Sequence, residues 1–233
     1  MEKNKDFSKL EKNLGLKFKN KDLLRQTMVH RSYLNENRGF DLESNERLEF
    51  LGDAVLELVV TVHLYENYPN PEGELTNWRA ALVNSQMLAK ISAKLDFENL
   101  LYLSRGEAKE KDTKARAQIL ANGVEAIIGA VYLEHGYDAA KEFITKLILV
   151  ELQAILENEL FLDPKSNFQE TAQEKTGFTP QYRVLSEKGP DHAKKFVVGV
   201  YLGKEKVATG TGTSKHEAQI AAAQEAIKNK NWN

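Results

Sequence analysis

The stretch NERLEFLGDAVL, residues 45–56, decides how the first two thirds of this sequence is interpreted. Within and beyond it, apolar residues recur at alternating steps of three and four. They are Leu48, Leu51, Val55, Leu58, Val62 and Tyr65. A stripe with this period predicts an α-helix over residues 46–65 that buries the stripe against the rest of its domain. Pro69 and Pro71 mark the end of the helical pattern.

Three acidic residues occupy a second face of the same helix. Glu46, Glu49 and Asp53 are spaced at i, i+3 and i+7, so they line one side of it. The commoner meaning of such spacing is a solvated acidic surface. Against that meaning, the residues between the acids are mostly apolar or glycine, and Arg47 is the only cation among them. Like charges on one face repel unless a cation compensates them, so this face is also a candidate cation site.

A second helix, predicted over residues 116–134, carries one acid in an otherwise apolar run. That acid is Glu125, and a buried carboxylate without a partner is costly. Asn122 and Gly129 lie three residues before it and four after it, forming a polar, small-residue strip that lets another helix approach closely. If the acidic face of the first helix packs there, oxygen-bearing side chains converge. Such a donor set suits Mg²⁺ or Mn²⁺ rather than zinc.

The length of 233 residues suits one large domain or one medium and one small domain, and the composition fits an intracellular protein. It has no cysteine, which excludes disulfides and thiolate metal sites. The charged N-terminus and the interrupted apolar stretch 143–156 predict neither a signal peptide nor a membrane span, so we expect a cytoplasmic protein. Residues 1–162 carry 21 Lys+Arg against 26 Asp+Glu, and residues 163–233 carry 11 against 8. This asymmetry fits a carboxylate metal site tethered to a polyanion-binding module, and chance explains it equally well.

The periodicity predicts two parts of different architecture. The first is all-α, with further helices over residues 72 or 75 to 95 and 137–159, the latter preceded by a stop at Gly136. The second is a small α+β domain in the order α-β-β-β-α. Its elements are expected at residues 165–176, 181–186, 195–201, 206–211 and 214–228. The predicted domains are residues 1–158 and 164–233, joined by a linker over residues 159–163.

Residues 45–56 resemble the signature of the ribonuclease III family, and other stretches agree with that family in order and spacing. In the first part these are His30-Arg31-Ser32, Glu72-Gly73-Glu74-Leu75 with Arg79-Ala80, and residues 119–133. In the second part they are Asp163-Pro164-Lys165 with Gln169-Glu170, residues 189–192, and residues 210–218. The resemblance covers nearly the whole chain. It implies an all-α nuclease domain followed by a small double-stranded-RNA-binding domain.

The resemblance also implies an activity. The chain would be an endoribonuclease that cleaves double-stranded RNA in the processing of ribosomal RNA precursors and other structured transcripts. Metal-activated water would leave 5′ phosphates and short 3′ overhangs, with Mg²⁺ as cofactor, Mn²⁺ as a substitute and no small-molecule cofactor. Two copies would form a homodimer, with Phe50 as an aromatic knob that inserts into the partner subunit. The alternative for Phe50 is an ordinary core residue.

The family's functional positions can be placed on this sequence. Asp53 and Glu125 match catalytic acids, and Glu49, Asn122 and Glu125 match metal ligands. The positions that match RNA contacts are Glu46 and Glu72 in the first domain and Gln169, Glu170, Pro190, His192 and Lys215 in the second. The second group would read the shape of A-form RNA through 2′-hydroxyls and phosphates.

Asn122 departs from the family's pattern, which usually has aspartate at this position. A carboxamide oxygen can still bind a hard cation, but the cluster loses one negative charge, so we expect a higher Mg²⁺ requirement. Since the other acids are present, we interpret the chain as an active nuclease. One alternative is a double-stranded-RNA-binding dimer whose cleavage is weakened or absent because of Asn122, by nature or by design. A structural dimer of a ribonucleoprotein particle is another.

Overall fold

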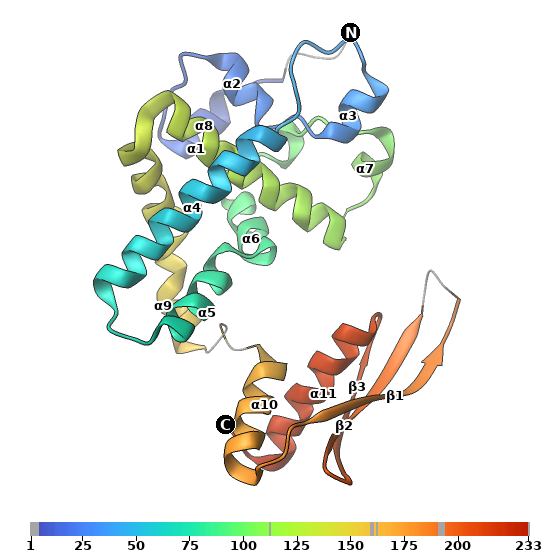
Figure 1. The fold of residues 1–233 in the computed structure, drawn as a ribbon. Coiled ribbons are helices and arrows are strands. Elements are labelled where there is room, and N and C mark those ends of the chain that lie inside the picture. Colours follow the sequence, from blue (N-terminus) through green and yellow to red (C-terminus); the bar gives the residue numbers. More distant parts are fainter. Residues whose placement is uncertain (1–4, 112, 159–160, 162, 191–193, 233) are drawn as a thin grey trace. The chain divides into compact units, whose positions relative to one another are not determined.

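The computed structural model describes residues 5–111, 113–158, 161, 163–190 and 194–232. The chain divides into two compact units, Met1–Phe161 and Leu162–Asn233. The first unit is helical, and the second combines two helices with a three-stranded sheet (Figure 1). The predicted fold class, an all-α part followed by an α-β-β-β-α part, is confirmed.

The described residues of the first unit form helices, with a single isolated bridge between Val29 and Tyr102. In chain order the helical segments are α1 (Ser8–Leu14), α2 (Lys21–Gln26), α3 (Arg31–Glu36), α4 (Glu46–Asn67), α5 (Glu72–Val83), α6 (Ser85–Leu95), η1 (Glu98–Leu100), α7 (Arg105–Lys109), α8 (Lys114–Leu147), η2 (Leu149–Glu151) and α9 (Leu152–Glu157). The two long helices α4 and α8 pack against each other and hold most of the residues discussed below.

The predicted helix over residues 46–65 is confirmed as α4, but the apolar stripe assigned to its buried face is wrong in its second half. Leu58 and Tyr65 are 52% and 80% exposed. The buried side chains are Leu48, Val55, Leu56, Val59, Val60 and Leu64, on a face that also includes Gly52. The helix carries apolar residues on two faces. The stripe spaced by three and four residues runs onto the outer face in its second half.

Three breaks interrupt the helices of the first unit, and the sequence predicts only the one at Gly136. The helix predicted to reach residue 95 is two, α5 and α6, because Asn84 leaves the helical conformation and its side chain accepts a hydrogen bond from the backbone N of Met87. The break predicted at Gly136 is present, because this residue leaves the helical conformation with φ 83°, which favours glycine, and α8 kinks there. The last predicted helix of this unit also breaks, after Leu147, and continues as η2 and α9.

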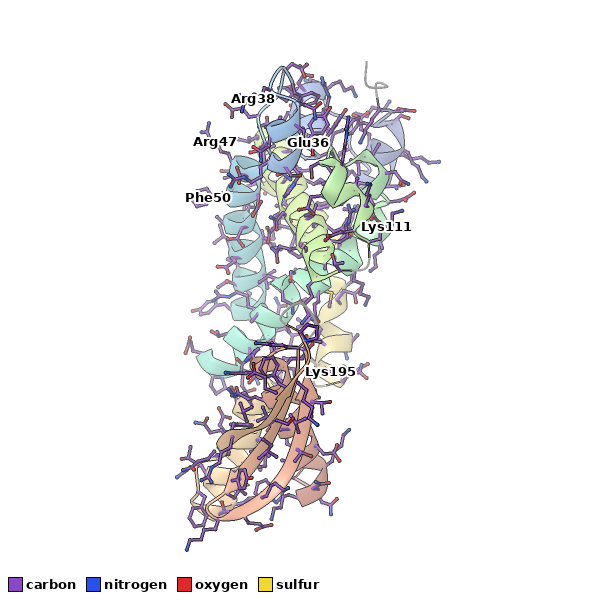
Figure 2. All side chains as sticks on the ribbon, turned by 90° about the vertical axis from the view of Figure 1, so that its right-hand side faces the viewer. Glu36, Arg38, Arg47, Phe50, Lys111 and Lys195 are labelled. Atoms are coloured by element: carbon purple, nitrogen blue, oxygen red, sulfur yellow. The ribbon has the colours of Figure 1, made fainter. Side chains whose placement is uncertain are left out.

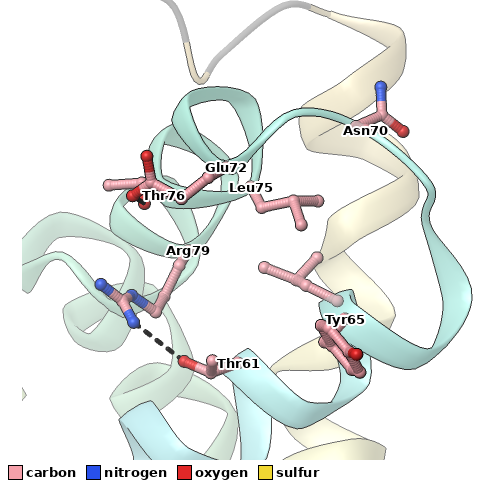
Figure 3. Close-up of a pocket in the computed structure, with 8 residues that line it drawn as sticks. Thr61, Tyr65, Asn70, Glu72, Leu75, Thr76 and Arg79 are labelled. Atoms are coloured by element: carbon pink, nitrogen blue, oxygen red, sulfur yellow. Dashed lines mark hydrogen bonds between the residues drawn. The ribbon is translucent and has the colours of Figure 1, made fainter.

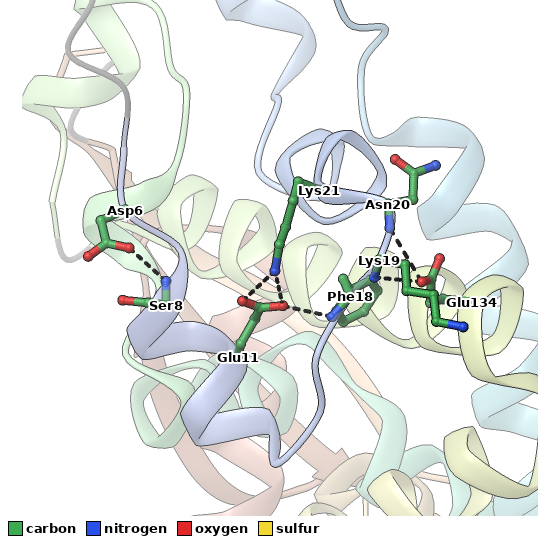
Figure 4. A network of polar contacts seen from close by, with 8 residues as sticks. All are labelled: Asp6, Ser8, Glu11, Phe18, Lys19, Asn20, Lys21 and Glu134. Carbon is green, nitrogen blue, oxygen red and sulfur yellow. Dashed lines mark hydrogen bonds and ion pairs between the residues drawn. The ribbon is translucent and has the colours of Figure 1, made fainter.

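Side-chain carboxylates fasten the N-terminal segment to the rest of the unit (Figure 4). Glu11 accepts hydrogen bonds from the backbone N of Phe18 at 2.7 Å and from Lys21 Nζ at 2.6 Å. Glu134, just before the kink in α8, accepts one from the backbone N of Lys19 at 2.7 Å. These contacts satisfy backbone donors that lie outside any helix, so the segment before α2 has a defined path.

The second unit places two helices against one antiparallel sheet of order β1-β2-β3. Its elements are α10 (Pro164–Thr176), β1 (Gln181–Lys188), β2 (Lys195–Leu202), β3 (Glu205–Gly212) and α11 (Lys215–Lys230). Phe168 of α10 is fully buried and stacks on Trp232. Gly210 of β3 lies so close to α11 that an added Cβ would sit 2.1 Å from the backbone N of Ala222. Small residues on both sides therefore let α11 rest directly on the sheet.

Across the part of the chain that the structure describes, no helix is long and apolar enough to cross a membrane.

Candidate active site and RNA-binding residues

The closest contact between α4 and α8 is made by glycines. A Cβ built on Gly52 would lie 1.7 Å from the backbone O of Glu125, and one on Gly129 would lie 2.3 Å from the backbone O of Leu48. The predicted small-residue strip on the second helix is therefore present and admits the first helix at backbone distance. Asp53 follows Gly52 directly, so this crossing brings it beside Glu125.

The acids of the two helices lie close enough to influence one another's protonation. Burial raises the pKa of Glu125 to about 7, and the charges of Asp53 and Glu49 add to the shift. Burial also raises the pKa of Glu49, the charges of Glu46 and Asp53 act in the same direction, and a hydrogen bond from Asn122 opposes them. We name Glu49, Asp53 and Glu125 the acid cluster. The fold thus brings together carboxylates from two helices at a cost in electrostatic repulsion.

The acid cluster has the donor chemistry of a site for a hard divalent cation. In the described part of the chain, the ion pairs of Lys and Arg side chains involve other carboxylates than these three. Oxygen donors carrying uncompensated negative charge are what Mg²⁺ and Mn²⁺ prefer. The same described residues contain no group of three acidic or histidine side chains already close enough to hold an ion. The carboxylate oxygens of these residues are suitable ligands for such a cation, and the side chains would have to move closer together to bind it.

Asn122 lies beside the acid cluster but turns its oxygen elsewhere. Its Oδ1 accepts a hydrogen bond from Gln118 Nε2 at 2.7 Å. The Asn122-Gly123 pair, a turn signal in isolation, is helical here, as the periodicity predicts. Gln118 could not be identified from the sequence, because a glutamine on an exposed helix face has no distinguishing pattern.

Glu46 is compensated by a cation that the sequence analysis overlooked. Arg31 Nη1 lies 3.2 Å from Glu46 Oε1, and Ser44 Oγ donates to Glu46 Oε2 at 2.9 Å. Arg31 belongs to the His30-Arg31-Ser32 stretch, so that motif contributes to the acidic face. Glu46 therefore differs from the acid cluster, because a guanidinium and a hydroxyl group already contact its carboxylate.

Glu72 lies near the opposite end of α4. It lines a pocket of about 440 Å³ together with Thr61, Leu64 and Tyr65 of α4, in which Arg79 Nη1 donates to Thr61 Oγ1 at 2.9 Å (Figure 3). Glu72 itself accepts a hydrogen bond from Thr76 Oγ1 at 3.1 Å. At about 1.5 Å of rise per residue, the twelve residues from Glu49 to Thr61 separate the two places by roughly 18 Å along the helix. Within one chain, Glu72 and the acid cluster are separate sites.

Phe50 is not a core residue of this chain. It is 80% exposed and projects outward from α4, next to Arg47 (Figure 2). It borders a depression of about 640 Å³, whose other lining residues are Leu23, Gln26, Glu43, Glu46, Arg47, Leu48, Leu51 and Leu133. An aromatic side chain at the edge of a partly apolar depression is the arrangement expected of an interface residue rather than of an internal one.

The predicted RNA-contacting residues of the second unit are on its surface. Gln169 and Glu170 are exposed on α10, on the side away from Phe168. Lys215 begins α11, with Nζ 5.9 Å from the ring centre of Phe196, and Phe196 pairs with Glu187 near the end of β1. Pro190 follows β1 and is exposed. The predicted contact at His192 lies outside the described residues.

Family models match both units. Residues 20–152 match the model described as Ribonuclease-III-like, and residues 164–230 match the model described as double-stranded RNA binding motif. The first match alone covers more than half of the chain.

Curated relatives match along nearly the whole length. Ribonuclease 3 of Dehalococcoides mccartyi is 40% identical over 224 residues, which is 96% of this chain and 94% of the relative. Ribonuclease 3 of Natranaerobius thermophilus is 44% identical over 220 residues, or 94% of each chain. The solved nuclease domain of ribonuclease III from Campylobacter jejuni superimposes with a TM-score of 0.54 at 39% identity, covering 61% of this chain and 96% of that one. The chain therefore belongs to the ribonuclease III family of double-strand-specific endoribonucleases and carries a double-stranded-RNA-binding domain.

Proposed function

We propose that this protein hydrolyses double-stranded RNA with the help of Mg²⁺, or of Mn²⁺ as a substitute, at the acid cluster. The observation that carries the proposal is the meeting of Glu49, Asp53 and Glu125 at the glycine crossing, where no Lys or Arg of the described residues pairs with them. The products would be 5′ phosphates with short 3′ overhangs. The substrates would include ribosomal RNA precursors and other structured transcripts, in the cytoplasm.

Each acid has a distinct part in this proposal. Glu49 and Glu125 would hold the cation from opposite helices, and Asp53 and Glu125 would be the catalytic acids. A bound divalent cation would activate water and neutralise charge on the phosphodiester.

The second unit would supply most of the affinity for duplex RNA. Gln169 and Glu170 on α10, and Pro190 and His192 after β1, would meet successive minor grooves, and Lys215 would contact phosphates between them. Glu46 and Glu72 would contact RNA from the first unit. Such contacts read the shape of an A-form duplex and leave sequence largely unread, so many transcripts would be accepted.

We also propose that the protein acts as a homodimer, with Phe50 inserted into the partner subunit. The related nuclease domain from Campylobacter jejuni is described as having a region involved in dimer formation. The exposure of Phe50 and the depression beside it support the same arrangement here. A dimer would also allow Glu72 of one copy to serve the acid cluster of the other, which a single chain does not permit.

Phe50→Ala is expected to weaken the dimer about tenfold or more, because buried aromatic anchors dominate interface energies. Sedimentation equilibrium of the full chain over a concentration series measures the dissociation constant. Phe178→Ala is the matched control, since Phe178 is 55% exposed in the second unit. A dissociation constant that Phe50→Ala leaves unchanged would contradict the proposed role of Phe50.

The cleavage activity is tested by titrating Mg²⁺ against a long, end-labelled RNA duplex. We expect cleavage by this chain, none by Asp53→Asn, and a Mg²⁺ requirement in Asn122→Asp that is lower by roughly threefold or more, because a fourth charge joins the acid cluster. A second candidate function is favoured by Asn122 itself: a duplex-binding dimer that does not cleave. Binding without cleavage by this chain, combined with cleavage by Asn122→Asp, would establish that second function.

A further inference from the structure

Lys165, in the first turn of α10, is bonded to α11. Its Nζ donates to Gln219 Oε1 at 3.0 Å and lies 5.2 Å from the ring centre of Tyr182 on β1. All three side chains are half-buried. Because its ammonium group is held by a carbonyl oxygen and by an aromatic face, Lys165 is a fixed part of the second unit.

The bond joins the two helices close to residues that are proposed to contact RNA. Lys165 lies four residues before Gln169 on α10, and Gln219 lies four residues after Lys215 on α11. Residues four apart are neighbours on one face of a helix. The bond is therefore one helical turn from the residue that would meet a minor groove and one turn from the residue that would meet phosphates.

Apolar packing leaves the register of α10 and α11 weakly fixed. The helices lie side by side (Figure 1), and the buried cluster they share with the sheet contains Phe168 and Ala172 of α10 and Ala222, Ala223 and Ala226 of α11. Apart from Phe168 these side chains are small, so they let the helices approach closely but form no tall ridges that would stop sliding. A hydrogen bond requires a set distance and direction, so it also fixes the register.

We propose that Lys165 is a positioning residue for duplex binding. Through Gln219 it holds α10 and α11 in the register that an A-form duplex requires, and it does not itself contact a phosphate. A binding surface that is already set to the spacing of the grooves loses less freedom when the RNA binds. The inference rests on the proposed RNA contacts of Gln169 and Lys215 and is independent of the acid cluster.

The test is a double-mutant cycle read by duplex binding. Fluorescence anisotropy measures the affinity of the full chain, Lys165→Met, Gln219→Met and the double variant for a labelled RNA duplex, in EDTA to prevent metal-dependent cleavage. Each single variant should bind about three- to tenfold more weakly, which corresponds to one lost hydrogen bond. The double variant should bind no more weakly than Lys165→Met, because the two residues act through the same bond.

Lys230→Met is the matched control. Lys230 also ties α11 to a neighbouring element, by a bond to Glu205 Oε1 at 2.9 Å, but it lies near the other end of the helix. The substitution removes the same charge as Lys165→Met. Its affinity should stay within about twofold of the parent chain.

The salt dependence of binding separates positioning from direct contact. A lysine that binds a phosphate releases counterions, so its removal lowers the slope of log affinity against log salt concentration by about one. We expect this loss for Lys215→Met. Lys165→Met should keep the slope of the Lys230→Met control, and Gln219→Met, which removes no charge, should keep the slope of the parent chain.

Three outcomes overturn the proposal. Affinities of Lys165→Met and Gln219→Met equal to that of the control would mean that the bond does not position the helices. A slope that falls in Lys165→Met as far as in Lys215→Met would mean that Lys165 contacts a phosphate directly. Additive losses in the double variant would mean that Lys165 does not act through Gln219.

Two further comparisons keep these results unambiguous. Circular dichroism establishes that each variant is folded, and if Lys165→Met is not, Gln219→Met decides by its affinity alone. A parent chain that does not bind the duplex would overturn the proposed RNA contacts and the positioning role together. A parent chain that binds, with variants equal to the control, would overturn the positioning role and leave the RNA contacts in place.

Discussion

Gly52→Ala is expected to lower the free energy of unfolding by roughly 3 kcal/mol or more, although alanine is the better helix former by about 1 kcal/mol. The new Cβ would lie 1.7 Å from the backbone O of Glu125 and 2.9 Å from the backbone N of Gly129. Because the obstacles are backbone atoms, no side chain can move aside to relieve the overlap. The helices α4 and α8 would have to separate, and with them the acid cluster.

Urea unfolding followed by circular dichroism, at one fixed protein concentration, measures the loss. Gly39→Ala is the control, because a Cβ at Gly39 meets nothing within 4 Å. We expect the control to stay within about 0.5 kcal/mol of the parent chain. A Gly52→Ala protein as stable as this control would mean that the two helices are further apart than described here.

Glu125→Gln is expected to reduce cleavage by at least about a hundredfold while making the metal-free protein more stable above pH 7. The loss of cleavage follows from removing an acid that the proposed function places at the reacting phosphodiester. The gain in stability follows from the pKa of Glu125, raised from 4.5 to about 7 in the folded chain. Below pH 4.5 the carboxyl is protonated in folded and unfolded chains alike, so folding carries no penalty there. As the pH rises through 7, the folded state must accept an unfavourable charge that the unfolded state carries freely.

The gain in the free energy of unfolding above pH 7 should be about 1–2 kcal/mol. A pKa difference is equivalent to roughly 1.4 kcal/mol for each unit, and we expect less than the full value for Glu125 because its side chain is partly solvated. Thermal unfolding in EDTA at pH 4.5 and pH 8 measures it, and Glu57→Gln, an exposed glutamate of α4, is the control. A stability difference that is the same at both pH values would show that Glu125 is not held against its neighbours' charges.

The sequence predicted the main elements of the fold because they depend on local signals. The periodic apolar residues of α4 and α8 are local features of this kind. The break at Asn84 was missed because the helical period continues across it. The buried face of α4 was misassigned at Leu58 and Tyr65 because only contact with α8 decides which of two apolar faces is inside.

The candidate site was predicted in part, for a similar reason. The spacing of Glu49 and Asp53, and the lone Glu125 beside Gly129, indicated a meeting of the two helices as one possibility, beside the commoner one of a solvated acidic face. The contributions of Arg31 and Gln118 were not predictable, because they depend on how long polar side chains turn at a surface. Which oxygen or nitrogen of a carboxamide faces a neighbour has no trace in the sequence.

The backbone contact at Gly52 and Gly129 has a consequence for how such a site can be varied. Because main-chain atoms set the spacing of the helices, the side chains around the crossing can change identity without changing that spacing. The scaffold and the charge of the site are therefore separable properties. A library that keeps both glycines and varies positions 49, 53, 122 and 125 would sample metal preference and turnover on a constant framework, whereas one that varies the glycines would mostly yield unfolded chains.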